Sequence, residues 1–123
     1  MEYQIITNNP NVKSSNENVF FIEGSFEDVL VKVRDLIHSG YQLISHPLGA
    51  SLRMMFSPYR SIIVGNKTVK LNDQYVEVIE NSIQNYKKHM CVRNPDIENS
   101  KDYALIDNEL LKSALEECKR IYQ

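Results

Sequence analysis

Residues 19–44 read VFFIEGSFEDVLVKVRDLIHSGYQLI, and this stretch decides the fold class. The apolar run over residues 19–22 predicts a strand that is covered on both faces. Ser25 and Asp28 then form a capping-box pattern, and Gly40 marks the end of the helix that follows. Apolar residues recur at helical spacing between these signals: Phe26, Val29, Leu30, Val33 and Ile37. Residues 41–44 begin the next strand at once, so the stretch is a strand–helix–strand unit, which favours a right-handed parallel crossover.

Further strands and helices are predicted on both sides of this unit. Residues 2–7 predict a first strand that stops at Asn8-Asn9-Pro10, where a short helical turn begins. Residues 61–64 predict a fourth strand, and residues 71–90 predict a second long helix. We therefore predict a single three-layer α/β domain over residues 1–123, with a small, mainly parallel sheet flanked by about three helices.

The last part of the chain is predicted to change from extended to helical structure. Residues 103–106 read Tyr-Ala-Leu-Ile and predict a short strand or a buried extended piece after a polar, turn-rich loop. Asp107 or Asn108 then caps a final helix. The apolar side of this helix consists of Leu111, Ala114, Leu115, Cys118 and Tyr122. We expect that side to close the core of the domain.

Composition and charge argue against several classes of function. There are 14 Lys and Arg against 16 Asp and Glu, and no basic run is longer than Lys87-Lys88, so little is available to neutralise a nucleic-acid backbone. No leader pattern and no apolar stretch near the ~18 residues of a membrane span are present, which predicts a soluble, cytoplasmic protein that does not bind membranes. Cys91 and Cys118 lack a CxxC partner, so we predict reduced thiols and no metal site. Without a dinucleotide or Walker motif we predict no cofactor.

Candidate functional residues gather in loops at the predicted strand ends. The third predicted strand is followed by Ser45-His46-Pro47-Leu48-Gly49-Ala50-Ser51, and the fourth is preceded by Ser57-Pro58-Tyr59-Arg60-Ser61. Open α/β sheets bind ligands outside the carboxyl ends of their strands. We therefore predict a ligand site at one edge of the sheet, made of Asn8, Asn9, His46, Ser51, Tyr59, Arg60 and Ser61.

These residues also have structural interpretations. The His46 imidazole could act as a base, a proton shuttle or a donor to an anion, or it could simply bond a neighbouring carbonyl. Asparagine in turns normally bonds its own backbone, and an arginine in a surface loop is usually solvated. The serines have no acid–base partner that spacing reveals, so we assign no triad and no catalytic residue.

Several motifs, taken in order, resemble the GrdX family. They are Thr7-Asn8-Asn9-Pro10, Phe21-Ile22-Glu23-Gly24-Ser25, Val33-Arg34-Asp35-Leu36-Ile37-His38-Ser39-Gly40, Ser45-His46-Pro47-Leu48, Ser57-Pro58-Tyr59-Arg60-Ser61, Ile79-Glu80-Asn81-Ser82 and Leu105-Ile106-Asp107. Members of that family are small accessory proteins encoded beside the clostridial glycine, sarcosine and betaine reductases, selenoenzymes of amino-acid fermentation. The resemblance implies the same pathway in anaerobic bacteria. Residues 52–56, Leu-Arg-Met-Met-Phe, depart from the family pattern, since relatives carry a polar, proline-containing loop there.

Three functions remain open at this stage. The first, which we favour, is a non-catalytic accessory or regulatory protein that captures a small anionic metabolite, or a protein such as a reductase subunit, at the strand ends. The second is a small enzyme that uses His46 as general acid and base. The third is an interaction module that docks through Leu52 to Phe56 or through its last helix. In this third case Met54, Met55 and Phe56 are predicted to form an exposed apolar surface that a homodimer would bury.

Overall fold

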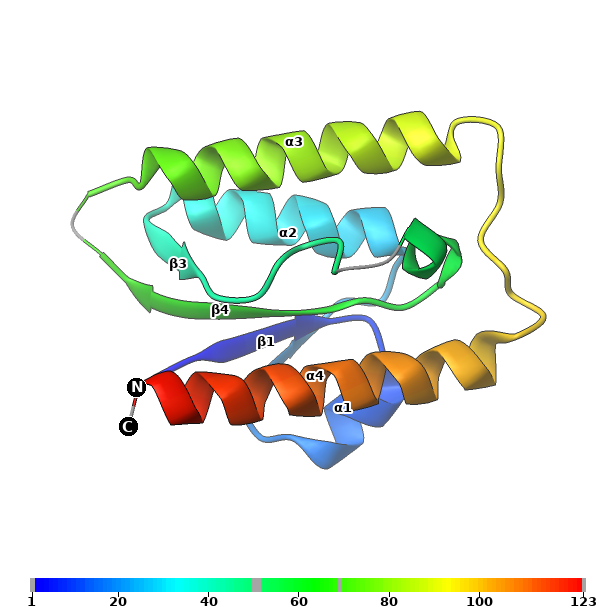
Figure 1. Cartoon of the computed structure of the whole chain (residues 1–123), viewed down its shortest axis with the longest axis horizontal. Helices are drawn as coiled ribbons and strands as arrows, with labels where there is room; N and C mark the ends of the chain where they lie inside the picture. Colours follow the sequence, from blue (N-terminus) through cyan, green and yellow to red (C-terminus); the bar gives the residue numbers. More distant parts are fainter. Residues whose placement is uncertain (1, 50–51, 69, 123) are drawn as a thin grey trace.

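The structure, a computed structural model, describes residues 2–49, 52–68 and 70–122. In these residues a four-stranded mixed sheet lies between two layers of helices (Figure 1). Its strands are β1 (Gln4–Thr7), β2 (Val19–Phe21), β3 (Tyr41–Leu43) and β4 (Ser61–Lys67), in the order β2-β1-β4-β3. The α/β class predicted from the sequence is therefore confirmed.

The pairing of the strands corrects the predicted sheet. β1 pairs with β2 in parallel, but β4 runs antiparallel to both β1 and β3. The prediction of a mainly parallel sheet is therefore wrong. β2 and β3 point the same way, as the predicted crossover requires, but they lie at opposite edges of the sheet with β1 and β4 between them. After β3 the chain passes through the short 3₁₀ helix η1 (Leu52–Phe56) and then forms β4 beside β3. Because these two strands are antiparallel, their connection needs no helical crossover.

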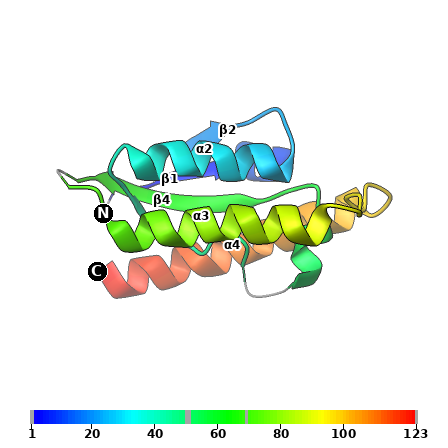
Figure 2. The same ribbon diagram turned by 90° about the horizontal axis from the view of Figure 1, so that it is seen from above.

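Helices cover both faces of the sheet. Within the described residues they are α1 (Pro10–Ser15), α2 (Phe26–His38), α3 (Asp73–Met90) and α4 (Ser100–Tyr122). α2 and α3 lie side by side on one face, as Figure 2 shows from above. α1 and α4 lie on the opposite face (Figure 1).

The two central strands supply both halves of the core. Ile6, Ile62 and Val64 are buried against α2 and α3, whereas Ile5 and Ile63 are buried against α1 and α4. This division follows from the alternation of side chains along a strand. Because both faces are covered, β1 and β4 form the buried centre of the fold, and polar residues at their ends are held by the packed sheet.

The predicted capping box of α2 is confirmed. The Asp28 N–H donates to the Ser25 hydroxyl at 3.2 Å, and the Ser25 N–H donates to the Asp28 carboxylate at 2.9 Å. Gly40 follows the helix with φ of 102°, a conformation that favours glycine. The start and the end of α2 are thus set by local side-chain and backbone chemistry.

The last helix begins earlier than predicted. Residues 103–106 lie inside α4 and form neither a strand nor an extended piece, so Asp107 does not cap the helix. In the helix Ala104 is buried, while Leu105 and Ile106 are 59% and 45% exposed. A short apolar run of this kind fits a strand or a helix equally well by pattern, and here the small Ala104 side chain lets the helix approach the sheet.

The apolar segment after β3 is part of the core. Met54 and Met55 are 8% and 4% exposed, and Met55 packs with the side chains between the sheet and α3. The prediction that these two residues form an exposed contact surface is therefore wrong. Flexible thioether side chains fill the irregular space that η1 leaves beside α3.

No helix among the described residues combines the length and the apolar character that crossing a membrane requires.

Candidate functional site

The carboxyl end of β1 lies beside the amino end of β4. Thr7 is paired with Ser61 across the two antiparallel strands, which places Asn8 next to Arg60. The Asn8 amide oxygen accepts the Arg60 N–H at 2.9 Å, and the Asn8 amide nitrogen donates to the carbonyls of Gly24 at 2.9 Å and Pro58 at 2.8 Å. Asn8 is buried and both of its N–H groups are used, so it positions the Arg60 backbone.

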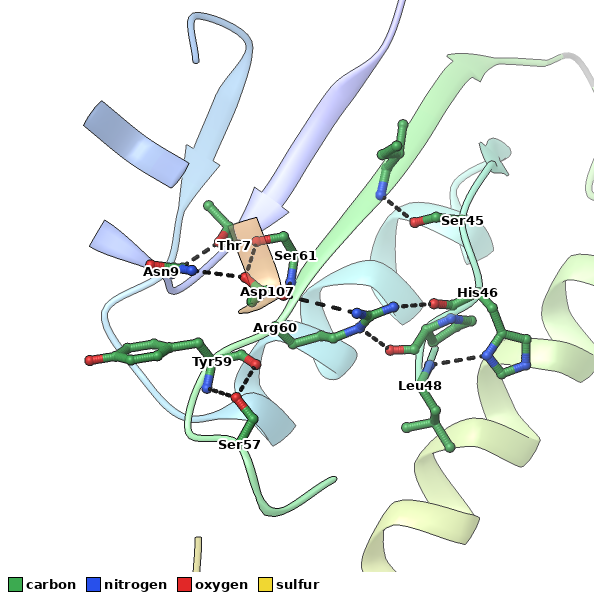
Figure 3. Close-up of polar contacts among 12 residues, drawn as sticks. Thr7, Asn9, Ser45, His46, Leu48, Ser57, Tyr59, Arg60, Ser61 and Asp107 are labelled. Carbon is green, nitrogen blue, oxygen red and sulfur yellow. Dashed lines mark hydrogen bonds and ion pairs between the residues drawn. The ribbon is translucent and has the colours of Figure 1, made fainter. Parts of the chain in front are cut away.

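A buried carboxylate on α4 joins the ends of these strands. The Asp107 side chain accepts the Ser61 N–H at 3.0 Å, the Ser61 hydroxyl at 2.7 Å and the Asn9 side-chain amide at 3.0 Å (Figure 3). The Thr7 and Ser61 hydroxyl oxygens are 2.7 Å apart. Since a carboxylate only accepts, the Ser61 hydroxyl donates to Asp107 and takes a hydrogen bond from Thr7. This network fixes α4 against the sheet.

Arg60 is the cation of the site and is only 5% exposed. Its Nε donates to the Pro47 carbonyl at 2.8 Å, and its Nη2 donates to the His46 carbonyl at 2.6 Å. Its Nη1 lies 3.9 Å from an Asp107 carboxylate oxygen, which is an ion pair but too long for a hydrogen bond. Burial lowers the pKa of Arg60, and the Asp107 charge opposes that shift.

The backbone carbonyl of His46 contacts this guanidinium, and the His46 ring turns toward Leu48 (Figure 3). The His46 Nδ1 accepts the Leu48 N–H at 3.1 Å, so the neutral ring carries its proton on Nε2. Partial burial, and then the charge of Arg60, lower the pKa of His46. The ring is therefore neutral near neutral pH and offers an Nε2–H donor rather than a free basic nitrogen.

The backbone at Gly49 approaches the guanidinium closely. Its φ is 73°, in the region that favours glycine, and a Cβ atom there would lie 3.4 Å from Nη2 of Arg60. The loop from Ser45 to Gly49 thus encloses one side of the Arg60 side chain.

A cavity of about 560 Å³ lies between this loop and α4. Its polar wall is made of Ser45, His46, Gly49, Arg60 and Ser61. Its second wall comes from α4 and is made of Leu110, Leu111, Ser113, Ala114 and Glu117. A smaller cavity of about 360 Å³ shares Ser45, His46, Ala114 and Glu117 with it.

The structure places the predicted site residues at different depths. His46, Arg60 and Ser61 line the cavity. Asn8 and Asn9 lie behind it, with their amide groups bonded to the strand ends and to α4. The predicted meeting of these residues at one end of the sheet is therefore observed, but for a different reason. Arg60 and Ser61 lie at the amino end of β4, which is beside the carboxyl end of β1 because the two strands are antiparallel. In a parallel sheet the amino end of β4 would lie at the opposite end. Their role in ligand binding stays a prediction.

Tyr59 is a predicted site residue that does not line the cavity. Tyr59 bonds Ser57 through its backbone, and its ring points away from Arg60 and His46 (Figure 3). Ser51 lies outside the described residues.

Sequence reasoning missed Asp107 as a member of the site. It interpreted this residue as a helix cap, whereas Asp107 is 1% exposed inside α4. One signal was present: Asp107 stands four residues before Leu111, at helical spacing on the apolar stripe. A carboxylate on such a stripe needs a buried partner, and Arg60 is that partner.

Comparisons with known proteins identify one family. The family model described as GrdX-like protein matches residues 4–116. No curated protein and no solved structure matches the chain significantly.

Proposed function

Because the chain belongs to the GrdX-like protein family, we propose that it is a non-catalytic accessory protein of glycine-reductase-type amino-acid metabolism, and that it binds a small carboxylate at Arg60. The pathway rests on the family. The binding chemistry rests on the cavity between α4 and the loop that carries His46.

One observation supports this proposal above the others: Arg60 Nη1 donates no hydrogen bond within the described residues, although the side chain is almost completely buried. Two carbonyls hold the other nitrogens, so the guanidinium is fixed before a ligand arrives. A guanidinium matches the shape of a carboxylate, and a fixed one loses little entropy on binding. Nη1 faces Asp107 at 3.9 Å without a hydrogen bond, so its hydrogens are available to an acceptor in the cavity that Arg60 lines.

The rest of the cavity suits a small organic acid. Its volume of about 560 Å³ lies within the roughly 300–1,000 Å³ that small-molecule sites occupy. His46 lines the same wall, and its ring carries an Nε2–H donor, while Leu110, Leu111 and Ala114 give the opposite wall an apolar surface. A carboxylate with an aliphatic body would satisfy both walls.

The hydrogen bonds of the site favour binding over turnover. A general base needs an unprotonated nitrogen directed at its substrate, but the His46 Nδ1 is already bonded to the Leu48 N–H. The Ser61 hydroxyl donates its proton to Asp107 and is held in the network behind the cavity. Neither group is arranged as a nucleophile with its base.

Calorimetric titration with pentanoate tests the proposal. We expect wild-type protein to bind pentanoate. Arg60→Lys should weaken binding about tenfold or more, since a charged hydrogen bond contributes about 1.5–3 kcal/mol and each 1.4 kcal/mol is tenfold. The matched control is Arg34→Lys on α2, a half-exposed arginine outside the lining of the cavity, which should bind like wild type.

His46→Ala provides a second variant, because the exposed ring can be removed without opening the core. It should weaken pentanoate binding while circular dichroism shows an intact fold. Absence of pentanoate binding in wild type, or equal affinity of wild type and the folded Arg60→Lys protein, would overturn the proposal.

A further inference from the structure

A second charged group faces the same cavity as Arg60. Glu117 on α4 lines both the larger and the smaller cavity. It forms no hydrogen bond or ion pair with another described residue. The neighbouring basic residues Lys112, Lys119 and Arg120 line neither cavity. The cavity thus has a buried cation at one place and, at another, an exposed carboxylate with no partner among the described residues.

The order of residues along α4 separates these two charges. Asp107 lies 3.9 Å from the Arg60 guanidinium and marks the cationic end. Glu117 is ten residues further along, which is about 15 Å at the rise of an α-helix. Both side chains lean toward the amino terminus, so the axial spacing of the two carboxylates stays at about 15 Å. The exposed Glu117 side chain can bend toward Arg60, which leaves roughly 10–15 Å between the two groups.

Apolar side chains occupy the space between the charges. Leu110, Leu111 and Ala114 line the cavity, and all three stand between Asp107 and Glu117 in the helix. The wall therefore runs from cation to aliphatic surface to anion. A ligand that matches this order has a carboxylate, a methylene chain and an ammonium group.

From this order we propose that the cavity takes an ω-ammonium carboxylate of about four to six carbons, with its carboxylate on Arg60 and its ammonium on Glu117. The length follows from the gap of roughly 10–15 Å, because hydrogen bonds of about 3 Å at each end leave about 4–9 Å between the carboxylate oxygen and the ammonium nitrogen of the ligand. This inference rests on the proposed carboxylate site. Glu117 also lies just beyond residues 4–116 that match the family, so the inference concerns this chain rather than the family.

Three probes of similar size test the inference by calorimetric titration. Pentanoate has the carboxylate alone, 5-aminopentanoate adds an ammonium at the far end, and 2-aminopentanoate adds one beside the carboxylate. We expect 5-aminopentanoate to bind about fivefold tighter than pentanoate, the gain of a partly exposed ion pair. We expect 2-aminopentanoate to show no such gain, because its ammonium cannot reach Glu117.

Two variants assign the gain to one carboxylate. Glu117→Gln should remove the preference, so that this variant binds 5-aminopentanoate no tighter than pentanoate. The matched control Glu116→Gln removes the same charge from an exposed residue of the same helix that lines neither cavity, and it should keep the preference.

The outcomes separate the two proposals. If pentanoate binds through Arg60 but 5-aminopentanoate gains nothing, or keeps its gain in Glu117→Gln, the inference is overturned and the proposed function stands. An equal gain for 2-aminopentanoate would also overturn the inference, since it would place the ammonium partner near Arg60. If neither pentanoate nor 5-aminopentanoate binds, both proposals fall together.

Discussion

Replacing Asp107 with asparagine removes the negative charge that faces Arg60 while keeping the size of the side chain. Asp107 and Arg60 are 1% and 5% exposed, so neither charge is well solvated. The asparagine amide also has one acceptor oxygen where the carboxylate has two. Ser61 and Asn9 donate three hydrogen bonds to the two carboxylate oxygens of Asp107. In the variant at least one of these donors would face the asparagine NH₂ group, which cannot accept a hydrogen bond. We expect a strongly destabilised protein.

The magnitude follows from the geometry of the pair. Two unit charges 3.9 Å apart attract by about 4 kcal/mol at an effective dielectric constant of about 20. Removing one partner of a buried ion pair typically costs about 3–5 kcal/mol, because the other charge stays buried and unpaired. We therefore expect Asp107→Asn to lower the free energy of unfolding by about 3–5 kcal/mol, a large part of the roughly 5–15 kcal/mol that stabilises a domain.

Urea denaturation followed by circular dichroism measures this loss. The control Glu116→Gln removes an exposed charge from the same helix and should stay within about 0.5 kcal/mol of wild type. Adding Arg60→Met to Asp107→Asn should recover part of the stability, with a coupling energy of about 1–3 kcal/mol in the double-mutant cycle. A loss in Asp107→Asn no larger than in the control, or a coupling energy of zero, would refute the reasoning.

Three further changes test other parts of the structure. Gly49→Ala should cost about 1–2 kcal/mol in urea denaturation, because its φ of 73° is strained for alanine; an unchanged midpoint would contradict this. Met55→Ala should cost about 2–5 kcal/mol at every protein concentration, since the side chain is 4% exposed in the core; a loss that disappears on dilution would instead indicate an interface. Because burial and Arg60 lower the pKa of His46, the folded protein binds fewer protons than the unfolded chain once the pH falls below about 6.5. Wild-type protein should therefore lose more stability than His46→Gln between about pH 7 and pH 5, and equal losses in urea titrations would contradict the shift.

The elements with strong local signals could be predicted from the sequence. Ser25, Asp28 and Gly40 set both ends of α2, because a capping box and a left-handed glycine act within a few residues of each other. The second long helix was predicted over residues 71–90 and is observed as Asp73–Met90. The loops that carry His46 and Arg60 were also found, since polar residues directly after or before an apolar strand are visible in the sequence.

The sheet was decided by tertiary structure. Alternation of side chains along a strand is the same in both directions, so the pattern of residues 61–64 gives a strand but not its orientation. In the folded protein β4 lies antiparallel between β1 and β3, and its two apolar faces complete the core against both helix layers.

Asp107 shows why the site itself could not be predicted in full. By local sequence it is a good helix cap, and residues 103–106 before it fit a strand or a helix equally well. Its burial becomes favourable only when Ser61 and Asn9 supply donors and Arg60 supplies a charge, and these partners are 46 to 98 residues away in the chain. The sequence alone therefore determined local elements and the loops of the site, whereas the network, the cavity and the place of Glu117 depend on long-range packing that brings α4 against the strand ends.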